Sequence, residues 1–107
     1  MKTSKTSLEY ITNRYSGFFD GLAERADFQR VLEVVENAVN TAVSDDVAVI
    51  GKLIVLSDAE KAVDAFAGFY RRILPPTIVN NLAEDLRWVV EKAREAAATL
   101  WLQGMRG

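Results

Sequence analysis

The 107-residue chain contains neither cysteine nor histidine. Their absence excludes disulfides, thiolate nucleophiles and the usual zinc and haem ligands, and it removes the commonest general base. A bundle di-iron site of the usual kind needs Glu-x-x-His pairs, which this chain cannot supply. We therefore expect a protein that is not an enzyme and that has no catalytic residue, no metal site and no cofactor.

Long apolar runs are also missing, although 50% of the residues are hydrophobic. No uninterrupted run approaches the roughly 20 residues that a membrane helix needs. The first ten residues, MKTSKTSLEY, include two lysines but lack the apolar centre of a secretory signal. These features favour a cytoplasmic protein without a membrane partner, and the length favours a single helical domain over residues 1–107.

Charge of neither sign dominates the chain, whose net charge is −2. The distribution is uneven, because residues 1–30 carry +1, residues 31–70 carry −5 and residues 71–107 carry +2. A protein that binds nucleic acid by itself is usually basic overall. Nucleic-acid binding by the isolated chain is therefore expected to be weak, although a local basic surface is possible.

The spacing of apolar residues predicts helices in the first half of the chain. Positions three and four apart are apolar at Leu8, Ile11, Tyr15, Phe18 and Leu22. This helix has Thr6 or Ser7 as its N-cap and is expected to end near Asp20. A second helix is expected after the capping residue Asp27, and it ends in the turn at residues 44–46.

The only two prolines are adjacent, and they predict the firmest helix boundary in the chain. Neither Pro75 nor Pro76 can donate a helical hydrogen bond, so a helix must end before them. That helix is expected to begin at residues 57–60, SDAE, which match a capping box. A long helix should follow from about Thr77, with Gly104 as its stop.

A heptad seam runs along this last helix and predicts packing at a shallow angle. Its apolar positions alternate by three and four residues at Val79, Leu82, Leu86, Val89, Ala93, Ala96 and Leu100. We therefore expect an all-α fold, a small up-and-down bundle of four to five helices with a long C-terminal helix.

The most unusual stretch is DDVAVIGKLIVLSDAE, residues 45–60, because Lys52 is the one charge within residues 47–56. Five β-branched residues and Gly51 favour a strand. No other part of the chain could pair with such a strand, however, so its backbone groups would stay unsatisfied. We favour a helix and leave the strand open. A helix that is apolar on all sides is either central in the core or covered by another chain.

Two tryptophans lie off the heptad seam, where large aromatic side chains either form a second core face or anchor an interface. The candidate interface residues are Val47, Ile50, Leu53, Ile54, Trp88 and Trp101. We expect a non-catalytic protein–protein interaction module, a small helical subunit that forms a homo-oligomer or docks on a larger complex.

An alternative function follows from FAGFYRR, residues 66–72, in which aromatic residues that could stack on bases stand beside two arginines. The aromatic residues are also at core spacing, and the arginines suit the C-terminal end of a helix dipole. Arg87 could pair with Glu84 or Glu91 of its own helix. The alternative is a helical subunit that contacts nucleic acid within a multi-subunit assembly, comparable to the small helical subunits of RNA-guided effector complexes, although no motif supports this comparison. Its candidate residues are Arg71, Arg72, Arg87 and Arg94.

Overall fold

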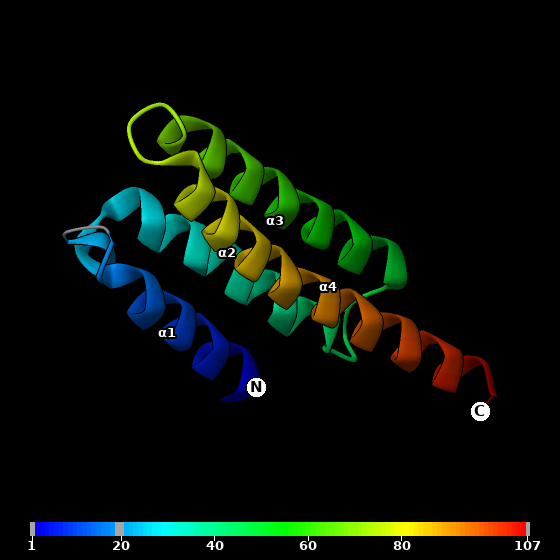
Figure 1. Cartoon of the computed structure of the whole chain (residues 1–107). Helices are drawn as coiled ribbons and strands as arrows, with labels where there is room; N and C mark the ends of the chain where they lie inside the picture. The colour runs from blue at the N-terminus through cyan, green and yellow to red at the C-terminus, as the bar shows by residue number, and fades with distance from the viewer. Residues whose placement is uncertain (1, 19–20, 107) are drawn as a thin grey trace.

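The computed structural model describes residues 2–18 and 21–106, with side chains for residues 8–18 and 21–104. These residues form four α-helices and one short 3-10 helix, and they contain no strand. The helices are α1 (Lys2–Ser16), the 3-10 helix η1 (Leu22–Glu24), α2 (Ala26–Ala42), α3 (Val49–Tyr70) and α4 (Pro76–Arg106). The predicted all-α bundle with a long C-terminal helix is confirmed (Figure 1).

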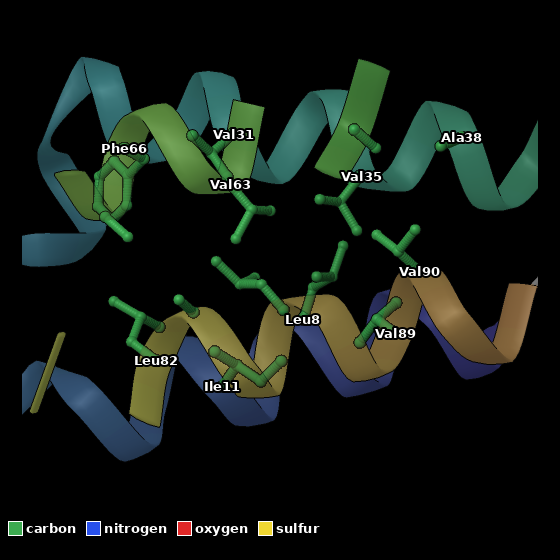
Figure 2. Close-up of a cluster of buried hydrophobic side chains, with 14 of the residues drawn as sticks. Leu8, Ile11, Val31, Val35, Ala38, Val63, Phe66, Leu82, Val89 and Val90 are labelled. Atoms are coloured by element: carbon green, nitrogen blue, oxygen red, sulfur yellow. The ribbon is translucent and has the colours of Figure 1, made fainter. Parts of the chain in front are cut away.

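The hydrophobic core lies between α2, α3 and α4, and α1 packs on α2 and α4. Buried side chains of α2 and α3 point toward those of α1 and α4 (Figure 2). The predicted seam of α4 is buried from Val79 to Ala93, whereas Ala96 and Leu100 are partly exposed. Over the described residues α1 does not pack on α3, so the outer side of α3 has no helix over it.

The apolar segment is helical from Val49 onward. The helix satisfies the backbone groups of this segment internally, which a lone strand could not do. Strand propensity spans only about 1 kcal/mol per residue, so it is readily overridden. Ala48 is the N-cap residue of α3, with an extended backbone and no side-chain hydrogen bond to the helix.

The predicted start of this helix at Ser57 is wrong, since Ser57 and Glu60 lie inside α3 and form no capping box. Gly104 does not end α4 either, because the helix continues to Arg106. A glycine in a helix costs only about 1 kcal/mol relative to alanine, which continued hydrogen bonding can outweigh. Local signals for helix ends were thus overridden in both helices.

The start of α1 also differs from the prediction, because the helix begins at Lys2 rather than near Leu8. It ends at Ser16, and Asp20, near which we expected the end, lies outside the described residues. Phe18 follows the helix and is exposed, whereas the sequence placed it on the core stripe. The turn then passes through Gly21, whose φ of 69° is in the left-handed region that glycine adopts without a Cβ clash.

The two prolines lie where the turn after α3 enters α4, so α3 ends before them, as predicted. α3 ends at Tyr70. The backbone N–H groups of Ile73 and Leu74 both donate hydrogen bonds to the carbonyl oxygen of Tyr70. Pro76 is the first residue of α4, a position where the missing N–H loses no helical bond. The turn reverses the chain, so that α4 runs back along α3.

Candidate protein interface

A row of polar side-chain contacts joins α3 to α4 along one side. Its three pairs are Arg71 with Asn80, Asp64 with Arg87, and Glu60 with Arg94. In the first, Arg71 Nε donates a 2.7 Å hydrogen bond to Asn80 Oδ1, and in the third, Arg94 Nη2 lies 2.5 Å from Glu60 Oε1. The partners on α4 recur every seven residues, about two turns, so they lie in line along that helix.

Trp101 is the next residue in this line, seven positions after Arg94. Leu53 lies seven positions before Glu60 on the antiparallel α3. Because Glu60 is opposite Arg94, the same register brings Trp101 to about the level of Leu53 along α3. Trp101 also lines a hollow together with Val49. The row of polar pairs therefore ends in apolar residues at the start of α3.

The first two turns of α3 leave large apolar side chains exposed on the outer side. Ile50 is 71% exposed, Leu53 45% and Ile54 56%, and the neighbouring Trp101 is 49% exposed. We call these four residues the apolar face. Leu56, on the inner side of the same turns, is fully buried. The segment is therefore not a central core helix, since only one of its sides packs inside the bundle.

No helix of the described chain covers the apolar face. α1 packs elsewhere, and the last turns of α4 run past the start of α3 along a neighbouring side (Figure 1). Beyond Leu56, the outer side of α3 becomes polar with Asp58, Lys61 and Asp64. The apolar face therefore ends where these polar residues begin.

Lys52, the one charge in the segment, is only 6% exposed. Its side chain lies on the inner side of α3 and lines the hollow with Ser44, Asp45 and Leu100. Among the described residues it forms no ion pair, and no buried side-chain nitrogen or oxygen lacks a partner. The aliphatic stem is therefore buried while the ammonium reaches water through the hollow.

Four of the six predicted interface residues come together in the apolar face. Val47 is half-buried in the turn before α3, where its Cγ1 lies 3.0 Å from the position of a Cβ at Gly51. Trp88 is exposed but lies thirteen residues before Trp101, about 20 Å along α4 and about 140° around it. Trp88 is therefore separate from the apolar face, and the Lys92 ammonium lies 5.7 Å from its ring centroid.

Leu102 is exposed and was not among the candidates. It lies next to Trp101 at the end of α4, where the bundle no longer surrounds the helix. Its position off the heptad seam is the same signal that identified the two tryptophans, but its smaller apolar side chain made the signal weaker.

The arginines proposed for nucleic acid are mostly engaged with protein groups. Arg87 pairs with Asp64 of α3, so the expected pairing with Glu84 or Glu91 is wrong. Arg94 contacts Glu60 and also Glu91, and the hydrogen bond to Glu60 raises the pKa of Arg94. Arg72 is exposed and forms no ion pair within the described part of the chain.

The aromatic residues of FAGFYRR divide between core and surface. Phe66 and Tyr70 are buried, with ring centroids 4.5 Å apart, as the core interpretation predicts. Phe69 and Ile73 are exposed, although the core interpretation placed them inside. α3 ends at this point, and its apolar residues cover a wider surface than α2 and α4 can bury. Phe69 borders a hollow between α2 and α3.

A tyrosine–aspartate hydrogen bond joins α2 to α3. The Tyr70 hydroxyl donates a 2.5 Å bond to Asp27 Oδ2, and Arg25 lies 5.2 Å from the ring centroid of Tyr70. Burial, and then the bond to Asp27, raises the pKa of Tyr70. Burial also acts to raise the pKa of Asp27, but hydrogen bonds from Tyr70, Arg25 and the Phe28 N–H outweigh it and lower that pKa. This network fixes the start of α2 against the end of α3.

The described residues contain no group of three or more acidic side chains that could hold a metal ion. Within that same part of the chain, no helix combines the length and hydropathy that a membrane crossing needs. The chain matches no protein-family model, and comparison with curated proteins and with solved structures finds no match.

Proposed function

We propose that this protein is a non-catalytic interaction module, a small helical subunit that associates with protein chains through the apolar face. The observation that carries the proposal is the exposure of Ile50, Leu53 and Ile54 side by side on two turns of α3, with exposed Trp101 at the same end of the bundle, where it lines a hollow with Val49. Large exposed apolar surfaces on small proteins commonly mark binding sites.

The composition of the face supports this function. Aromatic and branched apolar side chains supply most of the binding energy at protein interfaces when a partner excludes water from them. Each isoleucine or leucine that moves from water into an interface contributes about 1.5–3 kcal/mol when its burial is complete. Tryptophan contributes more area for little conformational entropy.

Nucleic-acid association is the second candidate, with less support. Of its four arginines, Arg87 and Arg94 are matched by acidic residues of α3, which reduces their attraction for phosphates. Arg71 is bonded to Asn80, which leaves Arg72 as the least engaged of the set.

A photoreactive phenylalanine analogue at Leu53 tests the proposal in cells that express the protein. We expect covalent adducts with protein at position 53, and their loss when Ile50→Asp is added. The same analogue at Tyr10, an exposed aromatic position on α1, serves as the matched control. Equal adduct formation at both positions, or none at position 53, would overturn the proposal.

A further inference from the structure

A hollow lies between the start of α3 and the last turns of α4. Val49 of α3 and Leu100 and Trp101 of α4 give it apolar walls, and Asp45 and Lys52 line it with charges of opposite sign. Its volume is about 330 Å³, at the lower end of the roughly 300–1,000 Å³ that is typical of ligand pockets. The hollow therefore has room for a small molecule rather than for a segment of another protein.

Lys52 brings an unpaired positive charge into the hollow. The residue is only 6% exposed, and it forms no ion pair within the part of the chain that the structure describes. Its ammonium also donates no hydrogen bond to another described residue. A lysine with unused donors and a buried stem attracts an anion more strongly than a lysine surrounded by water, because the local dielectric constant is lower.

The start of α3 adds to this positive charge. The N–H groups of a first helical turn have no partner within the helix. Ala48, the N-cap residue, has no side chain that could accept a hydrogen bond from them. Val49, the first residue of α3, lines the hollow. Because helix N-termini favour negative groups, the first turn and Lys52 together favour a carboxylate on this side of the hollow.

Asp45 supplies the opposite charge. It is exposed in the turn before α3, and it forms no ion pair with Lys52 or with any other residue that the structure describes. Its carboxylate only accepts hydrogen bonds, so it favours a ligand with an ammonium group and opposes a simple anion. The hollow thus combines a place for a carboxylate, a place for an ammonium and apolar walls.

We propose that the hollow binds a small apolar α-amino acid. The carboxylate of this ligand pairs with Lys52 and the first turn of α3, its ammonium pairs with Asp45, and its side chain packs on Leu100 and Trp101. A free amino acid carries both charges on one carbon atom, whereas a peptide separates them by its length. This binding site goes beyond the proposed function and does not depend on what covers the apolar face.

A nuclear magnetic resonance titration of the full chain with L-leucine tests the proposal. We expect shifts of the backbone signals of Val49 and Lys52 and of the indole N–H of Trp101. L-leucinamide lacks the carboxylate and isocaproate lacks the ammonium, so each should bind at least about tenfold more weakly, since each loses one charged contact. The proposal is overturned if millimolar leucine moves none of these signals, or if either analogue binds as tightly as leucine.

Variants of the two charged residues identify the site. Lys52→Met keeps the apolar stem but removes the ammonium, and it should weaken leucine binding at least about tenfold. Lys61→Met, at an exposed position on the outer side of α3, is the matched control and should bind leucine as the wild type does. Asp45→Asn should weaken the binding of leucine and strengthen that of isocaproate. This variant also tests the proposal if circular dichroism shows that Lys52→Met does not fold. Leucine binding that is unchanged in folded Lys52→Met, or in Asp45→Asn, would overturn the site.

Discussion

The hydroxyl of Tyr15 in α1 donates a 2.7 Å hydrogen bond to Oδ2 of Asp85 in α4. Arg14 also reaches this carboxylate, with its Nη1 3.1 Å from the same oxygen. Burial of Tyr15, and then its hydrogen bond to Asp85, raises its pKa from 10.0 to about 12. The contact therefore couples the docking of α1 to the protonation of one phenol.

Stability should fall at alkaline pH because of this phenol. The folded state keeps Tyr15 protonated to a higher pH than the unfolded state does, so its contribution is complete below pH 10 and is lost as the pH rises through about 12. Comparing wild type with Tyr15→Phe in a tyrosinate absorbance titration should identify one phenol that ionises near pH 12. If the phenol that the Tyr15→Phe variant lacks ionises near pH 10 in the wild type, the buried hydrogen bond is contradicted.

Gly68→Ala should stabilise the protein by about 0.5–1 kcal/mol. Gly68 lies inside α3, and a Cβ added there would have no atom within 4 Å apart from the helix's own nearby backbone and its chain neighbours. Alanine lowers the conformational entropy of the unfolded chain and suits a helix better. Urea unfolding measures the change, and Gly21→Ala is the control with the opposite sign, because its φ is 69°. A loss of stability at position 68 would count against a continuous α3.

Ala48→Asp should stabilise the fold by about 1 kcal/mol. Ala48 has the backbone of an N-cap residue but no side chain to accept a hydrogen bond from the first turn. An aspartate there can accept that bond, and its charge complements the helix dipole. Ala65→Asp, an exposed position in the middle of α3, should bring no such gain in the same unfolding assay. Equal effects at both positions would show that α3 does not start at Val49.

Nucleic-acid binding by the isolated chain should be weak and should disappear at moderate salt. Few phosphates can be neutralised when Arg87 and Arg94 already face acidic residues. Fluorescence anisotropy with single-stranded RNA over a salt series measures this, and Arg71→Ala with Arg72→Ala should remove the remaining signal. Tight binding that persists in salt, or survives the double substitution, would favour the alternative function.

The sequence predicts the first four turns of the α4 seam well, because its apolar residues recur at spacings of three and four. Val79, Leu82 and Leu86 are among the most buried side chains, as a helix packed along one stripe requires. Adjacent prolines likewise predict the turn between α3 and α4, since their effect on the backbone is local and needs no partner.

The sequence pattern could not predict where α3 starts or which side of the bundle its apolar face is on. The SDAE pattern is a local signal for a helix start. The backbone hydrogen bonds that a longer helix makes through residues 49–56 outweigh the capping box that this pattern could form. Within that segment, Ile50 and Leu56 are equally apolar, so periodicity cannot say which one faces the core. The outcome depends on where α2 and α4 lie, and contacts between distant segments decide that.

Ile50→Asp tests the central claim most directly, with sedimentation and circular dichroism measured on the same samples. The substituted side chain lies in the first turn of α3, where an acidic group complements the helix dipole and is exposed in the single chain. We expect the wild-type chain to sediment above 11.9 kDa, and the variant to sediment at 11.9 kDa with its helical signal and melting temperature retained. Phe69→Asp, exposed at the other end of α3, should leave the assembly intact. An Ile50→Asp chain that unfolds, or one that stays fully assembled, would contradict an interface at this face.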